Sequence, residues 1–106
     1  MLDTVNKYFV AWNNHNLSDL KKLFDNNIVL KDWDIKESGI ENVLKANERI
    51  FKDNPEIKVQ IKSISINTDK IMAQIKVFIT KNQTIDVVDV FTIKDNLITY
   101  IKAYKC

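Results

Sequence analysis

The chain has 106 residues, of which 45% are hydrophobic and 28% charged, a composition that fits one globular domain and argues against disorder. The net charge is +2, and the 16 Lys and Arg residues are interleaved with acids, which argues against a nucleic-acid partner. Apolar runs are only a few residues long and the N-terminus lacks the layout of a signal peptide, so we expect no membrane partner and a cytoplasmic location.

Residues 1–25 predict two helices separated by a polar break. Over residues 3–14 apolar side chains recur at helical spacing, and Asp3 or Thr4 is placed to cap the start. A second helix runs from Leu17 to about Asp25, with Asn16 as its cap. The apolar stripes contain Val5, Tyr8, Phe9 and Trp12 in the first helix and Leu17, Leu20, Leu23 and Phe24 in the second.

A strand and a third helix follow. Residues 27–33 alternate as a strand whose one face ends in Asp32. The stretch "SGIE" forms a capping box, in which Ser38 and Glu41 satisfy each other's free amides, and it opens a helix to about Lys52. The inner stripe of this helix contains Ile40, Val43, Leu44, Asn47, Ile50 and Phe51.

Four strands fill the second half of the chain, over residues 56–66, 70–80, 84–94 and 97–105. Their short polar connections imply an antiparallel meander. The apolar phase of the first strand changes near Lys62 and Ser63, which predicts a β-bulge that bends the sheet. The whole chain, residues 1–106, is therefore predicted as a single α+β domain with its helices on one side of a curved antiparallel sheet.

Three polar side chains interrupt apolar faces of these elements. Asp89 lies in the middle of the strand face formed by Ile85, Val87, Phe91 and Ile93, Asp32 follows Ile28 and Leu30, and Tyr8 lies between Val5 and Trp12. If the sheet curls around the helices, all three point toward the same interior. Structural roles stay open for each of them, since a strand Asp can face water at an edge and a helix Tyr can place its hydroxyl at the rim of the core.

Few other side chains suggest chemistry. Cys106 is the only cysteine and cannot form an internal disulfide, which favours a reducing compartment. His15 is the only histidine and is expected to be a solvated loop residue, so we expect no metal site and no cofactor. Asn47 is either a cavity group or a helix residue that reaches backbone or water. Trp33 either faces a partner subunit or covers the sheet.

Three stretches of the sequence resemble the nuclear transport factor 2-like superfamily, particularly its SnoaL-like and ketosteroid isomerase-like members. These are "YFVAWNNHNLSDLKKLFDNNIVLKD", "SGIENVLKANERIF" and "VVDVFTIKDNLITYIKAY", which lie between residues 8 and 104, so the likeness spans nearly the whole chain. The resemblance implies a cone-shaped, curved antiparallel sheet wrapped around three helices, an α+β roll that is also called cystatin-like. This superfold hosts enzymes and non-enzymes alike.

The resemblance to ketosteroid isomerase implies roles for the three inward groups. The general base falls on Asp32, the oxyanion-hole tyrosine on Tyr8, and a protonated oxyanion-hole aspartate on Asp89. Asp89 must be neutral at pH 7 for that role, and burial among apolar neighbours would raise its pKa. We expect the cavity to be lined by Trp12, Phe24, Asn47, Phe51 and Phe91. Trp33 departs from the proline that usually follows the base, and the bulk of Trp12 could shrink the cavity.

The function implied is the binding of a small apolar or carbonyl-containing molecule. Proton transfer next to the carbonyl, of the isomerase or polyketide-cyclase type, would follow from the three groups. The alternative is a module of the same fold without catalysis, which binds a ligand or acts through its dimer surface. In both cases we expect a homodimer formed on the outer face of the sheet.

Overall fold

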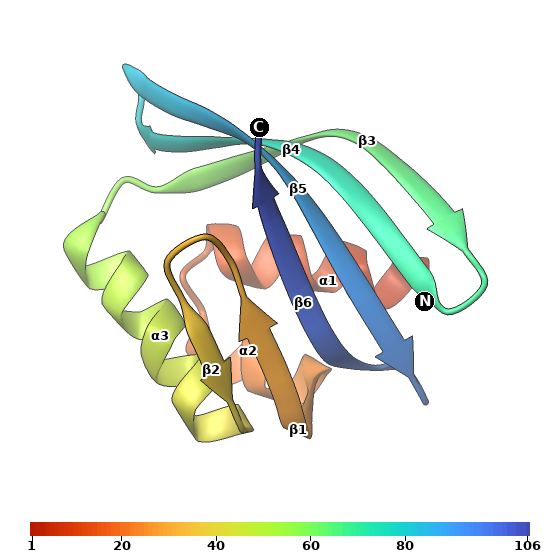
Figure 1. Ribbon diagram of the computed structural model, residues 1–106. Helices are drawn as coiled ribbons and strands as arrows, with labels where there is room; N and C mark the ends of the chain where they lie inside the picture. Colours follow the sequence, from red (N-terminus) through yellow and green to blue (C-terminus); the bar gives the residue numbers. More distant parts are fainter.

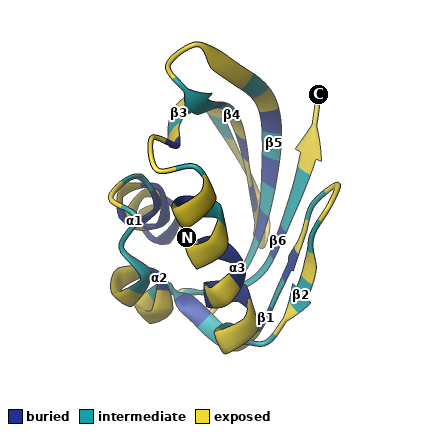
Figure 2. Cartoon of the chain, turned by 90° about the vertical axis from the view of Figure 1, so that its left-hand side faces the viewer, coloured by how far each residue is buried: buried dark blue, intermediate teal, exposed yellow.

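A computed structural model describes residues 1–106, which form three helices packed against one six-stranded sheet (Figure 1). The helices are α1 (Leu2–Asn13), α2 (Leu17–Leu23) and α3 (Ile40–Asp53). The strands are β1 (Phe24–Lys31), β2 (Lys36–Ser38), β3 (Lys58–Asn67), β4 (Lys70–Thr80), β5 (Gln83–Lys94) and β6 (Leu97–Lys105). Figure 2 shows all three helices on one side of the curved sheet, as the sequence predicted.

The sheet has the strand order β2-β1-β6-β5-β4-β3. The predicted antiparallel meander over β3 to β6 is confirmed, and so is the bulge, which shifts the β3–β4 register between Ile61 and Ser63. β1 pairs in parallel with β6, which the sequence did not predict. β2 adds a short antiparallel edge to β1, in a segment between residues 33 and 38 for which the sequence predicted no helix or strand.

The predicted ends of the first two helices are partly corrected. Asn16 caps α2 as expected, since its Oδ1 accepts a hydrogen bond from the Asp19 amide at 3.0 Å. α2 ends at Leu23 and not near Asp25, because Phe24 is already extended and pairs with Ile98 of β6. Neither Asp3 nor Thr4 caps α1, which begins at Leu2 without a side-chain cap.

The predicted capping box of α3 is wrong. Ser38 belongs to β2 and pairs with Val29 of β1, so its backbone is held in the sheet before the helix begins. The turn into α3 is made by Gly39, which has a φ of +90°, and its amide donates to the carbonyl of Ile28 at 2.8 Å. Glycine suits this position because it has no Cβ to strain the backbone at positive φ.

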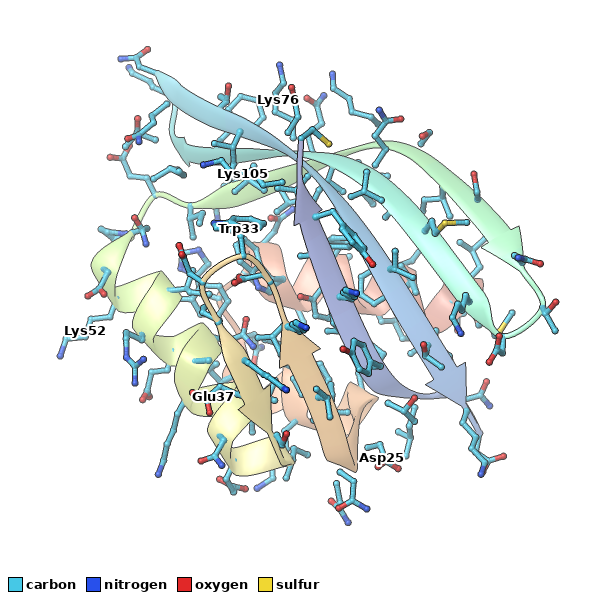
Figure 3. The ribbon with its side chains drawn as sticks, viewed as in Figure 1. Asp25, Trp33, Glu37, Lys52, Lys76 and Lys105 are labelled. Carbon is cyan, nitrogen blue, oxygen red and sulfur yellow. The ribbon has the colours of Figure 1, made fainter.

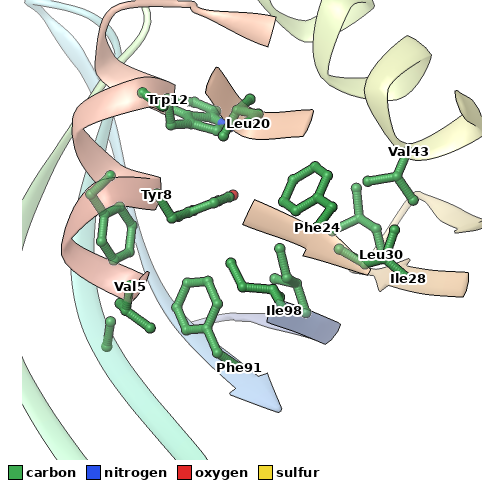
Figure 4. Close-up of a cluster of buried hydrophobic side chains, with 14 of the residues drawn as sticks. Val5, Tyr8, Trp12, Leu20, Phe24, Ile28, Leu30, Val43, Phe91 and Ile98 are labelled. Carbon is green, nitrogen blue, oxygen red and sulfur yellow. The ribbon is translucent and has the colours of Figure 1, made fainter. Parts of the chain in front are cut away.

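The hydrophobic core lies between the helices and the concave face of the sheet (Figure 4). Its centre is aromatic: the Tyr8 and Phe91 rings lie 5.2 Å apart and the Phe9 and Phe91 rings 5.6 Å apart, both edge to face. Such pairs contribute about 0.5–1.5 kcal/mol beyond the area they bury. No helix of the chain has the length and apolar character needed to cross a bilayer.

Candidate functional site

A cavity of about 310 Å³ opens between α1, α3 and the concave face of the sheet. Its lining is mostly apolar, and the exceptions are a small set of polar side chains: Asp32, Asp34, Asn47, Asn54 and Asp89, together with the Tyr8 hydroxyl and the Trp12 indole. An apolar cavity with a few convergent polar groups is the usual form of a small-molecule site, and ~300 Å³ is the lower end of the usual size range.

Strand register brings the two aspartates into one row across the sheet. Asp89 of β5 pairs with Ala103 of β6, and Lys31 of β1 pairs with Lys102. Asp32 is the first residue after β1, and extending the β1–β6 register by one residue places it beside Ala103. With neighbouring strands ~4.8 Å apart, this extended register puts the Cα atoms of Asp32 and Asp89 about 10 Å apart.

Asp89 is a buried acid, with 8% of its surface exposed. Burial raises the pKa of its carboxyl group from 3.8 to about 7, and the negative charge of Asp32 adds to this rise. No protein group donates a hydrogen bond to Asp89. Every side-chain oxygen that is fully enclosed in the structure has a hydrogen-bond partner, so the Asp89 oxygens are not fully enclosed. The Asp89 carboxyl group is therefore open to the cavity, where a ligand can reach it.

Tyr8 approaches the cavity from α1. Figure 4 shows its ring extending from the helix toward Phe24 and Leu30, with the hydroxyl at the far end. Burial, and then the charge of Asp89, raise the pKa of this hydroxyl well above its ordinary value. Tyr8 stays protonated. Its hydroxyl forms no hydrogen bond to the protein, and because every fully enclosed side-chain oxygen has a partner, this hydroxyl is open to the cavity.

Asp32 lies where β1 ends and the chain turns into β2. Its Oδ1 accepts hydrogen bonds from the amides of Asp34 at 2.7 Å and Ile35 at 2.6 Å. These two bonds fix the orientation of the carboxylate, while Oδ2 has no protein donor. The site therefore combines one oriented carboxylate, that of Asp32, with the Asp89 carboxyl group on the other side of Ala103 and the Tyr8 hydroxyl from α1.

Two of the predicted lining residues, Trp12 and Asn47, form a hydrogen-bonded pair in the cavity wall. The Trp12 indole N–H donates to Asn47 Oδ1 at 3.0 Å, and Asn47 Nδ2 donates to the Val43 carbonyl at 3.0 Å. Asn47 thus combines the two alternatives left open by the sequence, because it is a cavity group that also bonds to helix backbone. The pair joins α1 to α3 and fixes the plane of the indole.

The other predicted lining residues lie outside the cavity wall. Phe24, Phe51 and Phe91 are buried in the core and do not line the cavity. Phe51 stacks on the His15 ring, with centroids 4.3 Å apart. His15 is therefore not the solvated loop residue that the sequence predicted: it is half-buried, and its Nε2 bonds to the Ile57 carbonyl at 2.8 Å. This hydrogen bond fixes the polar connection between α1 and α2 to the segment that precedes β3.

The mouth of the cavity contains residues that sequence reasoning missed. Trp33, Asp34 and Ile35 form the tip of the β1–β2 hairpin and line the opening. Trp33 is 44% exposed, and the Lys105 ammonium lies 5.9 Å from its ring centroid (Figure 3). Ala103 was also missed, because an alanine carries no signal of a site. No three His, Cys, Asp or Glu side chains are grouped closely enough to bind a metal ion.

Residues 5–101 match the family of SnoaL-like domains. The chain belongs to the SnoaL-like domain family. The resemblance inferred from the sequence is confirmed by this match and by the solved structures that share the fold. No curated protein matches the sequence significantly.

Solved structures similar to this SnoaL-like domain come from several bacteria. A suggested polyketide cyclase from Sinorhizobium meliloti has a TM-score of 0.88 at 22% identity and covers 95% of this chain and 93% of its own. A suggested ketosteroid isomerase from Kribbella flavida has a TM-score of 0.85 at 11% identity, with coverages of 98% and 76%. An LEH-like epoxide hydrolase from M. tuberculosis has a TM-score of 0.78 at 15% identity, with coverages of 98% and 80%. At these identities the similarity establishes the fold alone.

Proposed function

We propose that this SnoaL-like domain binds a small carbonyl compound in its cavity and moves a proton between carbon atoms next to the carbonyl group. The observation that carries the proposal is the pair of unpartnered, protonatable oxygens of Tyr8 and Asp89, which face the same apolar cavity as Asp32. Neither oxygen is hydrogen-bonded to the protein and neither is fully enclosed, so both are available to hydrogen-bond a ligand oxygen inside the cavity.

Each group has a role in the proposed reaction. Asp32 Oδ2 removes a proton from the carbon next to the carbonyl, and the electron pair of the broken C–H bond forms the C=C bond of an enolate. Tyr8 and Asp89 donate hydrogen bonds to the oxygen, where the negative charge develops. Asp32 then returns the proton to another carbon of the conjugated system, which restores the carboxylate. No cofactor is needed for this sequence.

The protonation states suit these roles near neutral pH. The raised pKa of Asp89, about 7, leaves a large share of its carboxyl groups neutral and able to donate. The hydroxyl of Tyr8 is protonated over the same range, since its pKa is raised well above 10. Each oxyanion-hole donor of this kind contributes about 2.7–4 kcal/mol to lowering a barrier.

The test combines turnover and binding. A small cyclic β,γ-unsaturated ketone is offered as substrate, and the conjugated product is followed by ultraviolet absorbance. 2-Naphthol, a planar phenol that imitates an enolate, is titrated by fluorescence. Tyr8→Phe and Asp32→Asn are compared with the wild type. We expect weak isomerisation that Asp32→Asn abolishes, and naphthol binding that Tyr8→Phe weakens. A folded wild type that shows neither activity nor binding contradicts the proposal.

A non-catalytic binding module remains the second candidate, and one observation favours it. The Oδ1 atom of Asp32 holds the hairpin amides of Asp34 and Ile35, which gives this carboxylate a structural task without any catalysis. Naphthol binding of the wild type without turnover of the ketone would support this candidate, and turnover that depends on Asp32 would reject it.

A further inference from the structure

The concave face of the sheet contains a row of four cross-strand neighbours at the level of the site. Asp89 of β5 pairs with Ala103 of β6 on one side and with Ala73 of β4 on the other. Continuing the β1–β6 register by one residue places Asp32 on the far side of Ala103. The order across the sheet is therefore Asp32, Ala103, Asp89 and Ala73, with an alanine on each side of the buried acid.

The two alanines differ in what covers them. Ala73 is fully buried and does not line the cavity, whereas Ala103 is half-buried and does line it. The methyl group of Ala103 is thus the only side chain between the two carboxyl groups along the row. Side chains stand nearly perpendicular to a sheet, so any larger group at residue 103 would project into the space between Asp32 and Asp89.

We propose that Ala103 is a specificity-determining residue, whose methyl group is the floor on which a flat ligand lies between Asp32 and Asp89. A planar ring or conjugated system can lie against a methyl floor and reach both carboxyl groups. A ligand with a bulky tetrahedral centre at this point is excluded by the same floor. The inference rests on the proposed function for the roles of the two carboxyl groups, while the steric role of Ala103 is tested independently of them.

The experiment enlarges each alanine in turn. Ala103→Val and Ala103→Leu are expected to raise the Kd of 2-naphthol by at least about tenfold, the effect of one or more misplaced methyl groups in a pocket. Their thermal midpoints should stay close to the wild-type value, because the added carbons enter the cavity. The matched control is Ala73→Val, on the other side of Asp89: it should lower the thermal midpoint by overpacking and leave the Kd unchanged.

A second probe separates this inference from the proposed function. Xenon enters apolar cavities without requiring an acid or a base, and its binding is read from amide shifts of cavity residues in NMR spectra. We expect xenon shifts in the wild type and their loss in Ala103→Leu. If the wild type binds xenon but neither binds 2-naphthol nor isomerises the ketone, the proposed function fails while the xenon data still decide the role of Ala103.

Three outcomes would overturn the inference. Ala103→Leu could retain both naphthol affinity and xenon shifts, or Ala73→Val could weaken naphthol binding as much as the Ala103 variants do. The third outcome is measured on Ala103→Gly. This variant adds no atoms, so it can be tested even if the larger variants fail to fold. Removing the methyl group should increase the affinity for 1-methyl-2-naphthol relative to that for 2-naphthol, compared with the wild type. The absence of this change in relative affinity would contradict the proposal.

Discussion

At Asp89, protonation is linked to the free energy of unfolding. The pKa is about 7 in the folded chain and 3.8 in the reference state, so between these pH values the folded protein binds a proton that the unfolded chain has lost. Stability therefore falls as pH rises through this range, by about 1.4 kcal/mol per pH unit, and is constant above it. The full effect is on the order of 4 kcal/mol.

We expect Asp89→Asn to remove this dependence. Urea unfolding of the wild type and of the variant from pH 4.5 to 8 gives two stability curves, and the wild type should lose stability relative to the variant until about pH 7, the pKa of Asp89. Subtracting the stability curve of the variant from that of the wild type cancels the contributions of the other carboxylates to the pH dependence. Parallel curves over the whole range would show that the Asp89 carboxyl group is not perturbed in the folded protein.

Replacing Asp89 should cost little stability, because no protein group depends on it. Its carboxyl group has no hydrogen-bond partner in the protein, so Asp89→Asn orphans nothing. Asp89→Leu also removes the ionised carboxylate and should stabilise the fold at pH 8 by about 1–4 kcal/mol. Both variants should weaken naphthol binding or turnover. Thermal melts decide the matter: a loss of about 1–3 kcal/mol in both variants would mean that Asp89 supports a buried network.

Asp32→Asn separates the hairpin role of this residue from its proposed catalytic role. The amide oxygen of Asn can accept the same bonds from the Asp34 and Ile35 amides, so the thermal midpoint should hardly change. An amide cannot accept the substrate proton, and kcat should fall by about 10²–10⁴. Asp34→Asn, at the mouth of the same cavity, is the matched control and should retain activity. Equal kcat values for the two variants would remove Asp32 from the mechanism.

The junction between β2 and α3 gives a test of the backbone of one element. A Cβ at Gly39 would meet no atom within 4 Å, so Gly39→Ala causes no clash and costs only the strain of a φ of +90°. We expect a loss of about 1–3 kcal/mol, measured by urea unfolding. Ser38→Ala is the control, because Ser38 does not cap the helix, and its cost should lie within ~0.5 kcal/mol. A larger loss of unfolding free energy in Ser38→Ala than in Gly39→Ala would show that Ser38 does cap α3.

Sequence patterns predicted those elements whose physical causes are local. The two-residue period and the short polar turns of β3 to β6 determine their pairing without help from the rest of the chain. The β1–β6 pairing has no such turn, since the two strands are far apart in the sequence, and pattern alone could not reveal it. The short β2, with mostly exposed side chains, shows no apolar alternation to detect.

The same distinction applies to the candidate site. Tyr8, Asp32 and Asp89 were found because each interrupts an apolar face, and all three line the cavity. Phe24, Phe51 and Phe91 were assigned to its wall because periodicity tells which side of an element is buried but not whether core or cavity covers it. Trp33 and Ala103 were missed because their contribution depends on a hairpin tip and on a cross-strand register, which only the folded chain contains.

For the whole molecule, we propose a homodimer formed on the outer face of the sheet. Residues that alternate with the cavity side chains occupy that face, and Tyr104 there is 48% exposed, with Val88, Val90 and Tyr100 half-buried nearby. Sedimentation should give a species of twice 12.4 kDa. Val90→Lys, which places a charge in the middle of the face, should shift the protein toward the monomer. A wild-type monomer at micromolar concentration would reject the proposal.

The parallel pairing of β1 with β6 also determines when the cavity can form during protein synthesis. Asp32 leaves the ribosome about 70 residues before Ala103, its neighbour in the finished sheet, and synthesis proceeds at ≈5–20 residues per second. The apolar surfaces of the helices and β1 that β6 covers therefore stay exposed for several seconds. β6 lies between β1 and β5, so no partial sheet made from earlier strands can join the two halves of the site. A nascent chain halted before residue 97 should expose this surface and depend on chaperones until its last strand arrives.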